Sequence, residues 1–288
     1  MKTAQVLVEA LPYIKQFSGK TVVIKYGGHA MHNEIMKEKV ISDIVLMKFV
    51  GINPVIVHGG GPAINYWVEK NGGEPEFVNG LRVTDKDTME VAQMVLVGRI
   101  NQEIVAMIQK LGGKAMGISG VDGGTITAHK KEMVVDGEEI DLGFVGEVSG
   151  IDAELINQAI AHDYIPVISP IGCDEMGQVY NINADSAAGS IAASLKADKM
   201  FLLTDINGVQ DDNDNVISVL DFEKAEDYKK KGVIRGGMIP KVDCCIEAIR
   251  GGVNSVHIVD GCLEHSMLLE LFTDEGIGTM VVKGAEIK

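Results

Sequence analysis

The sequence predicts an α/β protein with a mostly parallel sheet covered by helices on both faces. Short runs rich in β-branched residues alternate with stretches of helical periodicity along most of the chain. Strands that alternate with helices in this way favour parallel pairing through crossover connections. The 34 glycines cluster at the ends of the apolar runs, which indicates tight turns between strands and helices.

The N-terminal segment precedes this alternation and predicts an amphipathic helix that begins near Thr3. Its apolar residues recur at helical spacing on one face, namely Val6, Leu7, Ala10, Leu11, Ile14 and Phe17. Pro12 is expected to kink this helix. The apolar face packs either against the core of the same chain or against another subunit, and both interpretations stay open.

The strands and helices of the sheet region follow in order. Apolar runs typical of buried strands cover residues 21–26, 54–58, 115–119, 165–169, 200–204 and 255–259. Helical periodicity covers residues 34–50, 63–70, 86–111, 153–162, 184–195 and 242–250. Residues 126–135, with the turn at Asp136-Gly137, predict a projecting hairpin, and residues 178–181 and 213–218 predict smaller hairpins.

The length of the chain allows one large domain or two linked lobes. Its 288 residues, of which 46% are hydrophobic, are enough for a substantial core. If there are two lobes, Gly172 and Gly177 place the break near residues 171–178. We therefore expect a separate helix over residues 1–19, an N-terminal lobe over residues 20–177 and a C-terminal lobe over residues 178–288.

Charge and cysteine content argue against several classes of partner. A formal net charge of −15 repels nucleic acid and anionic membranes, so we expect neither as a partner. No apolar run reaches the roughly 18 residues that span a bilayer, and the first residues show no signal-peptide pattern. The four cysteines have no zinc-type spacing, and the histidines are scattered. We expect a reduced, cytoplasmic protein without a structural metal, in which Cys244 and Cys245 are buried thiols.

Two predicted strands end in glycine-rich turns that suit an anion. KYGG (residues 25–28) ends the first strand, and HGGGP (residues 58–62) ends the second. Successive glycines let backbone N–H groups approach an anion without interference from Cβ, and a following helix adds its partial positive charge. Either turn alone is explained as a simple strand-to-helix connection. Two of them, one carrying Lys25, favour a phosphate site, although the P-loop and GxGxxG patterns are both missing.

A third glycine turn, Gly236-Gly237, opens the predicted helix that carries Lys241. A lysine in the first turn of a helix faces the positive end of the helix dipole, so an anionic ligand explains it better than a structural role does. Phosphoryl transfer needs cations along the transferring group. Lys25 and Lys241 are the candidates for those cations.

Arg82, in NGLRVT (residues 79–84), is a candidate for bidentate recognition of a carboxylate, with a surface salt bridge as the alternative. In NINAD (residues 181–185), Asn181 and Asn183 share one side of an extended approach to a helix. Asp185 falls in the first turn of that helix. These polar residues are either helix caps or ligands, with the amides on a substrate and Asp185 orienting the two lysines, and the two roles are compatible.

The strand over residues 200–204 ends in a further polar loop. Thr204, Asp205 and Gly208 in that loop suit the nucleotide side of a cleft, because ligands of parallel sheets bind beyond the carboxyl ends of the strands.

Taken together, these motifs resemble the amino acid kinase family. The resemblance covers nearly the whole chain and rests on KYGG (25–28), VHGGGP (57–62), NGLRVT (79–84), NINAD (181–185), LLTDINGV (202–209) and GGMIPK (236–241). NGLRVT together with NINAD is the specific part, because the related aspartate, glutamate, uridylate and carbamate kinases usually lack that pair. The chain is most similar to members that phosphorylate N-acetyl-L-glutamate in arginine biosynthesis.

The resemblance implies a three-layer αβα sandwich of the carbamate and amino acid kinase type. Its N-terminal lobe would bind the acyl amino acid, and its C-terminal lobe would bind ATP with Mg²⁺. The γ-carboxylate of N-acetyl-L-glutamate would become an acyl phosphate. Lys25 and Lys241 would stabilise the transition state, and Asp185 would organise them.

The resemblance also implies binding roles for the glycine turns and their neighbours. Gly60 and Gly61 would donate N–H groups to the substrate carboxylate or the γ-phosphoryl group, Arg82 would bind the α-carboxylate, and Asn181 and Asn183 would lie nearby. The nucleotide side would comprise Gly27, Gly28, Thr204, Asp205, Gly208, Gly236 and Gly237.

The amphipathic N-terminal segment resembles the extra helix of arginine-sensitive members of the family. There it interlaces dimers into a hexameric ring, a trimer of dimers, and L-arginine binds as a feedback inhibitor. The resemblance implies a homohexamer and an arginine site that involves Tyr13, Lys196, His265, Glu275 and Gly278.

Two alternatives stay open at this point. A kinase of an N-acylated or carrier-linked aminoadipate would carry similar motifs, because the length of a pocket is not readable from sequence. A non-catalytic amino-acid sensor on the same fold would keep the arginine site. The presence of Lys25, Lys241 and Asp185 together argues against such a sensor.

Overall fold

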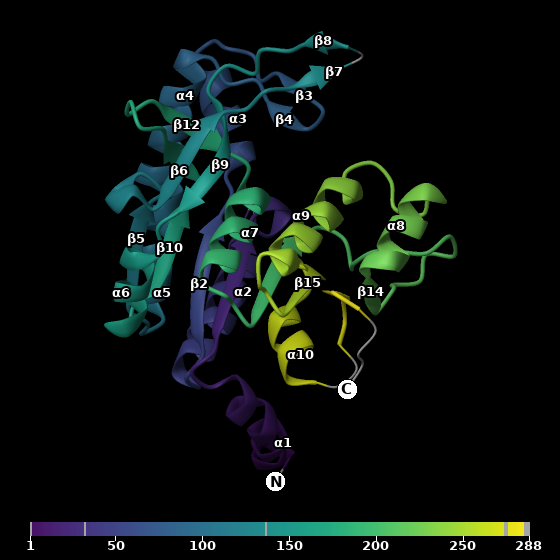
Figure 1. The fold of residues 1–288 in the computed structure, drawn as a ribbon. Helices are drawn as coiled ribbons and strands as arrows, with labels where there is room; N and C mark the ends of the chain where they lie inside the picture. Colours follow the sequence, from purple (N-terminus) through teal and green to yellow (C-terminus); the bar gives the residue numbers. More distant parts are fainter. Residues whose placement is uncertain (1, 32, 136, 274–275, 285–288) are drawn as a thin grey trace.

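The computed structural model describes residues 2–31, 33–135, 137–273 and 276–284 (Figure 1). An eight-stranded sheet lies at its centre, in the order β14-β16-β15-β13-β1-β2-β10-β5. Its strands are β1 (Thr21–Tyr26), β2 (Asn53–His58), β5 (Ala115–Ser119), β10 (Ile165–Ser169), β13 (Lys199–Thr204), β14 (Val219–Asp221), β15 (Ser255–Asp260) and β16 (Thr279–Val282). Neighbouring strands are parallel except β15 and β16. The predicted mostly parallel sheet is confirmed, and the bounds of the six predicted strands shift by no more than one residue.

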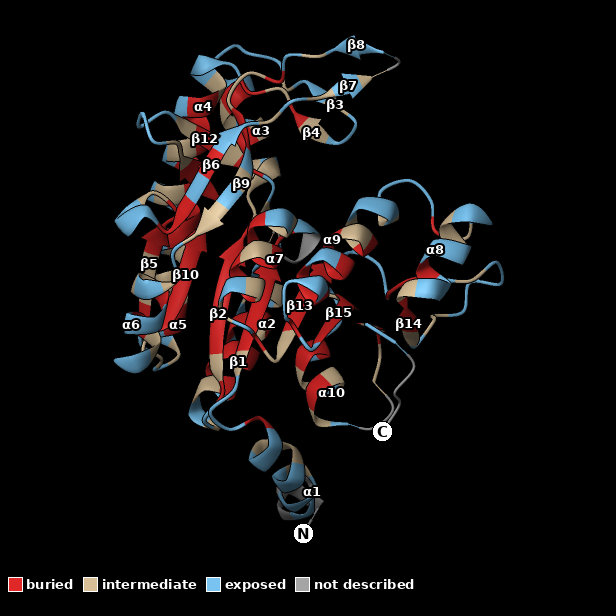
Figure 2. Ribbon diagram, viewed as in Figure 1, coloured by how far each residue is buried: buried red, intermediate tan, exposed pale blue. Residues whose placement is uncertain are grey.

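Helices cover both faces of this sheet, as the alternation of the sequence predicted. The buried side chains of one face pack with α2 (Glu34–Phe49), α3 (Gly61–Lys70) and α10 (Ser266–Phe272), and with the long helical run described below. Those of the other face pack with α6 (Glu154–Ala161), α7 (Ala184–Ser194), α8 (Phe222–Lys230) and α9 (Met238–Arg250). Figure 2 shows the strands as the buried centre between exposed outer helix surfaces.

The side chains of β1 alternate between the two faces. Val22 and Ile24 join the core on the α2 face, whereas Val23 joins the core on the α7 face. Because successive side chains of a strand point to opposite faces, Lys25 belongs to the α7 face. The sheet continues from β1 to β13, and the division into lobes over residues 20–177 and 178–288 stays a prediction.

The helix predicted over residues 86–111 contains a different segment in its middle. It consists of α4 (Lys86–Gln93), the π-helical segment η2 (Met94–Ile100) and α5 (Asn101–Lys110). The expectation of one regular α-helix is corrected here, because the N–H of Asn101 reaches back to the carbonyl of Leu96 in the wider π pattern. By length and composition alone this run, Lys86–Lys110, could cross a bilayer, but 44% of its most apolar window is buried inside the fold.

A small four-stranded barrel lies beside the sheet. It consists of β6 (Ile126–Lys130), β9 (Val145–Ile151), β11 (Ile171–Cys173) and β12 (Val179–Ile182). Its strand pairs β6–β9 and β11–β12 are antiparallel, so the hairpins predicted in these regions are present, but their closure into a barrel was not foreseen. The strands β7 (Val134–Val135) and β8 (Glu138–Glu139) pair at the projecting tip (Figure 1). The third predicted hairpin, at residues 213–218, is reduced to one bridge between Gln210 and Val216.

Helix α1 (Lys2–Phe17) begins one residue before the predicted start and continues through Pro12. Figure 1 shows it extending away from the sheet. Phe17 at its end is buried in the core, whereas Val8 and Leu11 are 67% and 46% exposed. The core-packing interpretation therefore holds for the end of α1, and the exposed apolar residues leave the subunit-contact interpretation open.

Candidate active site

The glycine turns lie side by side at the carboxyl edge of the sheet. Strands β1 and β2 run in register, with Tyr26 opposite His58, so both chains leave the sheet at the same level. The N–H of Gly59 donates to the carbonyl oxygen of Tyr26 at 2.7 Å and joins the two turns directly. This edge is where parallel sheets bind their ligands.

One carboxylate lies between the two predicted lysines. Asp185, in the first turn of α7, places Oδ1 2.9 Å from the Nζ of Lys25. Its Oδ2 lies 3.2 Å from the Nζ of Lys241, in the first turn of α9. Three elements distant in sequence thus bring together the residues that the sequence proposed as a catalytic group. Because two ammonium groups share one carboxylate, the cluster keeps an excess positive charge beside the glycine turns.

The ionisation of Asp185 follows from these contacts. Burial raises the pKa of a carboxyl group, but the charges of Lys25 and Lys241 and their hydrogen bonds outweigh it and hold the pKa of Asp185 below its usual range. The carboxylate is therefore ionised at neutral pH. Its backbone is held as well, since the thiol of Cys244 lies 3.1 Å from the carbonyl oxygen of Asp185. Cys244 and Cys245 are free and buried, as predicted.

A cavity of about 230 Å³ lies between the glycine turns and the hairpin of β3 (Phe77–Val78) and β4 (Leu81–Arg82). Because the residues predicted to bind the substrate line it, it is called the substrate cavity below. Predicted site residues from both halves of the chain line it, namely Lys25, Gly27, Gly28, Gly60, Gly61, Arg82, Asn181, Asn183 and Asp185.

Arg82 lies on the wall of the substrate cavity and is 7% exposed, so the alternative of a surface salt bridge is wrong. Its Nη2 donates to the carbonyl oxygen of Gly61 at 2.9 Å. Its guanidinium carbon lies 4.7 Å above the ring of Phe77, which packs on the planar group. Within the described part of the chain, Nη1 is buried and has no hydrogen-bond partner. A buried cationic donor without an acceptor fits an anionic ligand.

The two asparagines differ in their contacts, although both line the substrate cavity. The amide nitrogen of Asn181 donates to Thr84 Oγ1 at 3.3 Å. The side-chain oxygen of Asn183 caps α7 and accepts from the N–H groups of Asp185 and Ser186 at 2.9 and 3.1 Å. The capping role is therefore present for Asn183, and its place beside the cavity leaves a ligand role compatible.

A second, larger cavity of about 950 Å³ adjoins the first. Because Gly236 and Gly237, predicted for the nucleotide side, line it, it is called the nucleotide cavity below. Asn183 and Asp185 line both cavities, while Gly236, Gly237 and Lys241 line only the larger one. The cluster of Lys25, Asp185 and Lys241 thus lies where the two cavities meet.

The remaining nucleotide-side candidates follow β13 at the same edge of the sheet but line neither cavity. Thr204 is buried, and its hydroxyl donates to Asp205 Oδ1 at 3.2 Å. Gly208 has φ +139° and leaves no room for a Cβ beside Thr279, so a glycine is needed there for the fold. A contact of these residues with nucleotide stays a prediction.

Three of the candidates for an arginine site, Tyr13, His265 and Gly278, lie on or beside α1 and α10. Tyr13 packs against the core, and His265 Nδ1 lies 2.6 Å from Asp43 Oδ1. Lys196 is exposed in the turn between α7 and β13. The N–H of Gly278 donates to Glu270 Oε2 at 3.1 Å. Glu275 lies outside the described residues.

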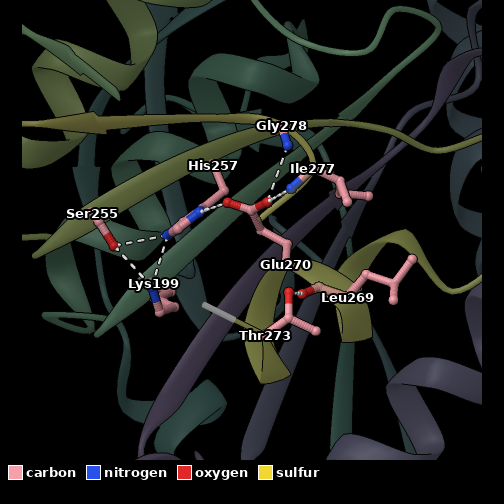
Figure 3. Close-up of polar contacts among 8 residues, drawn as sticks. All are labelled: Lys199, Ser255, His257, Leu269, Glu270, Thr273, Ile277 and Gly278. Atoms are coloured by element: carbon pink, nitrogen blue, oxygen red, sulfur yellow. Dashed lines mark hydrogen bonds and ion pairs between the residues drawn. The ribbon is translucent and has the colours of Figure 1, made fainter. Parts of the chain in front are cut away.

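Figure 3 shows a buried polar network next to Gly278 that the sequence did not reveal. His257 Nδ1 lies 2.6 Å from Glu270 Oε1, and Lys199 Nζ lies 2.8 Å from His257 Nε2. Burial lowers the pKa of His257 and of Lys199, whereas hydrogen bonds from His257 and from the 277–278 backbone hold the pKa of Glu270 low despite its burial. The network fixes the segment that leads into β16.

Phe77 was also missed, although the sequence carried a usable signal. Asn79 and Gly80 have φ of +48° and +80° and form a tight turn between β3 (Phe77–Val78) and β4 (Leu81–Arg82). An Asn-Gly pair at the centre of a two-residue turn places the residues on either side opposite each other. Val78 is paired with Leu81 directly beside the turn, and Phe77 is paired with Arg82 one position further along the two strands.

Comparison with known proteins agrees with this geometry. The profile of the amino acid kinase family matches residues 20–260. Acetylglutamate kinase of Heliobacterium modesticaldum is 56% identical over 98% of this chain and 99% of its own length. Acetylglutamate kinase of Syntrophomonas wolfei is 57% identical over 98% of both chains.

Solved structures of lower sequence identity resemble this chain over nearly its whole length. N-acetylglutamate synthase from Neisseria gonorrhoeae, in complex with coenzyme A and N-acetyl-glutamate, superposes with a TM-score of 0.87 at 27% identity. The alignment covers 98% of this chain but 64% of the synthase chain. The same synthase in complex with coenzyme A and L-arginine superposes with a TM-score of 0.83 at 26% identity, over 98% of this chain and 66% of the synthase.

Proposed function

The chain belongs to the amino acid kinase family, and on that premise we propose that it is an acetylglutamate kinase. It transfers the γ-phosphoryl group of ATP to the γ-carboxylate of N-acetyl-L-glutamate, a step of arginine biosynthesis. Near-complete alignment with acetylglutamate kinases supports this activity over that of other family members.

One observation carries the proposal, namely the position of the Lys25–Asp185–Lys241 cluster where the two cavities meet. A phosphoryl group in transfer must lie between an acceptor on one side and a nucleotide on the other. Its transition state spreads negative charge over the transferring oxygens, and fixed cations stabilise it. The cluster offers two cations at that point.

The reaction assigns a role to each part of the site. An oxygen of the γ-carboxylate attacks the γ-phosphorus, the bond from that phosphorus to the β–γ bridging oxygen breaks, and ADP leaves with the bond electrons. Lys25 and Lys241 stabilise the charge that develops, and Asp185 holds both ammonium groups in place. Gly60 and Gly61 donate their backbone N–H groups to the substrate carboxylate or to the γ-phosphoryl group. Both N–H groups are available for this, because neither has a partner among the described backbone hydrogen bonds outside helices and strands.

The other end of the substrate meets Arg82. Its buried Nη1 has no partner in the described chain and is suited to the α-carboxylate, while its Nη2 stays on Gly61. Asn181 and Asn183 line the same cavity and are suited to the acetamido group of the substrate. Thus the acyl amino acid is held at both ends.

ATP enters with Mg²⁺ on its phosphates, as is usual for kinases. Bound with the nucleotide, Mg²⁺ would supply positive charge that offsets the charge of the phosphates during transfer. Gly27 and Gly28 at the substrate cavity and Gly236 and Gly237 at the nucleotide cavity would present their backbone to the phosphates from the two sides of the Asp185 carboxylate. The loop with Thr204, Asp205 and Gly208 lines neither cavity, and its contact with the nucleotide is part of the proposal. No step assigned to the protein side chains depends on a resident metal.

Trapping of the product tests the reaction type. An acyl phosphate reacts with hydroxylamine to give a hydroxamate, so wild-type protein with ATP, Mg²⁺ and N-acetyl-L-glutamate should yield the γ-hydroxamate in step with ADP. ADP release without hydroxamate would contradict phosphorylation of a carboxylate. A pure amino-acid sensor would give neither product.

We further propose regulation by L-arginine and assembly into a hexamer in the cytoplasm. The exposed Val8 and Leu11 on α1 support a subunit contact, because a helix that extends from the body has little of its own chain to cover them. Tyr13, His265 and Gly278 lie on or beside α1 and α10, which contact each other. The arginine complex of the related synthase adds support for arginine binding on this fold.

A further inference from the structure

A buried polar cluster lies directly beneath the glycine turn of β2 and has no role in the reaction as proposed. It comprises His58 at the end of β2, Ser169 at the end of β10 and Asn101 at the start of α5. The three residues are 0%, 0% and 2% exposed. Burial of polar side chains is costly unless each finds a hydrogen-bond partner, so the contacts of these three residues determine what the cluster does.

The hydrogen bonds determine the state of the imidazole. His58 Nδ1 lies 3.0 Å from the carbonyl oxygen of Gly59, which can only accept, so Nδ1 carries the proton. His58 Nε2 faces Ser169 Oγ at 3.1 Å and the amide nitrogen of Asn101 at 3.3 Å, and both can donate to it. Burial lowers the pKa of His58 to about 4, so the ring is neutral. Neutral imidazole with its proton on Nδ1 donates to Gly59 and accepts at Nε2 from Asn101 or from Ser169, whose single hydroxyl proton goes either to Nε2 or to the carbonyl oxygen of Leu96.

Asn101 and Ser169 are themselves held in place. The amide nitrogen of Asn101 donates to the carbonyl of Val167 at 2.8 Å, and its side-chain oxygen fills the space that a Cβ at Gly117 would need. Ser169 Oγ lies 3.3 Å from the carbonyl oxygen of Leu96, which also accepts the π-type bond from the N–H of Asn101. The cluster therefore ties the imidazole to β10 and to the π-helical segment.

The bond from His58 to Gly59 controls the next peptide group. The carbonyl of Gly59 and the N–H of Gly60 belong to one planar trans peptide and point in opposite directions. Because the carbonyl is drawn toward the buried ring, the N–H of Gly60 points away from it. Leu96 and Ile100 pack closely against Gly60, since a Cβ on Gly60 would lie 2.5 and 2.6 Å from their terminal carbons.

We propose that His58 is a positioning residue, which through its hydrogen bond to Gly59 aims the N–H of Gly60 at the substrate cavity, and that Ser169 and Asn101 hold its ring. The proposal rests on the proposed function in one respect, because Gly60 is there a donor to the reacting carboxylate or phosphoryl group. Without the bond the Gly59–Gly60 peptide is free to rotate, and the donor is lost from the transition state.

Two substitutions of His58 separate this role from a general packing role. In His58→Asn the side-chain amide nitrogen stands close to the former Nδ1 and can still donate to Gly59. In His58→Gln the amide oxygen can reach the former Nε2 position and accept from Ser169 and Asn101 instead, and the donor to Gly59 is lost. Each variant keeps one half of the contacts, so we expect similar melting temperatures.

We expect kcat of His58→Gln to fall by about 10- to 100-fold, with the KM for ATP unchanged, because one transition-state donor is misplaced. His58→Asn should recover kcat to within about threefold of wild type. Equal kcat values in the two variants, or a higher kcat in His58→Gln than in His58→Asn, would overturn the proposal.

A measurement on the wild-type protein is independent of its activity. Two-dimensional ¹H–¹⁵N spectra of histidine-labelled protein should show His58 neutral with its proton on Nδ1 at pH 6. A proton on Nε2 would overturn the proposal even if kinase activity is present. Conversely, wild-type protein with the Nδ1–H tautomer but no phosphorylation of N-acetyl-L-glutamate would contradict the proposed function and leave the peptide orientation standing.

Discussion

The Nζ of Lys25 lies 2.9 Å from Oδ1 of Asp185, and this ion pair joins the first strand of the sheet to the helix that borders both cavities. The second carboxylate oxygen holds Lys241 from α9. The two ammonium groups lie 2.9 and 3.2 Å from the carboxylate oxygens, and they would repel each other without the carboxylate between them. Phosphoryl transfer as proposed depends on this arrangement.

Replacement of Lys25 by alanine should lower kcat by about 100- to 1,000-fold, comparable to the loss of one transition-state donor. The matched control is Lys20→Ala, because Lys20 forms an exposed ion pair with Asp198 just before the same strand. Steady-state kinetics and thermal unfolding of both variants provide the measurement. A Lys25→Ala enzyme with kcat within a few-fold of wild type would show that the cluster is not catalytic.

Replacement of Arg82 by lysine should raise the KM for N-acetyl-L-glutamate by about 10- to 100-fold, since a charged hydrogen bond contributes about 1.5–3 kcal/mol. Lysine keeps the charge but cannot bond Gly61 and a carboxylate together or stack on Phe77 in the same way. Arg250→Lys is the control, because Arg250 lies over Phe222 away from the site. Equal effects of the two substitutions on the KM would show that Arg82 has no specific role in substrate recognition.

The pKa of Asp185 gives a prediction on stability. Its pKa is lower in the folded protein than in the unfolded chain, where it is about 3.9, so the ionised group stabilises the fold above that pH. This contribution is lost as the pH falls from about 4 through the lower folded pKa. Asp185→Asn should therefore be less stable than wild type at pH 7, by about 3 kcal/mol, and the difference should shrink below pH 4.

Urea unfolding of wild type and Asp185→Asn at several pH values between 7 and 3 measures this difference. Other carboxyl groups titrate equally in both proteins, so the comparison isolates Asp185. A difference in unfolding free energy that is constant across the range would contradict the lowered pKa.

Exposed apolar residues on α1 give a prediction on assembly. The double substitution Val8→Asp and Leu11→Asp should reduce the oligomer mass seen by light scattering, because charges would be buried in the subunit contact. Inhibition by L-arginine should weaken in parallel. Gln5→Asp is the control, since Gln5 is also exposed but its side chain is polar. A double variant with the full wild-type mass would reject the role of this helix in assembly.

Much of the site was predictable because its chemistry is carried by local sequence. Glycine turns after apolar strands, with lysines next to them, are typical of sites that bind anions. Parallel strands then force the turns after β1 and β2 to one edge. Asp185 follows β12 of the barrel, so its contact with Lys25 depends on how α7 packs against the sheet. The helix cap at Asn183 was foreseen because an asparagine directly before a helical stretch is a preferred N-cap.

Other features depend on packing between distant segments and were not predictable. The π-helical segment Met94–Ile100 has no distinct composition, and its Leu96 and Ile100 pack against Gly60, which lies far away in the sequence. The His58 cluster joins residues from three separate elements, and a lone histidine before a glycine turn gives no sign of its partners. Arg82 looked equally suited to the surface, and only the fold of its hairpin shows that it is buried.

The most direct test of the central claim is a coupled assay of ADP release with a panel of acceptors. The panel comprises N-acetyl-L-glutamate, L-glutamate, L-aspartate and N-acetyl-L-aminoadipate, each with ATP and Mg²⁺, with and without L-arginine. We predict the highest kcat/KM for N-acetyl-L-glutamate and a lower rate when L-arginine is present. A higher kcat/KM for N-acetyl-L-aminoadipate or for an amino acid without the acetyl group would contradict the proposed activity.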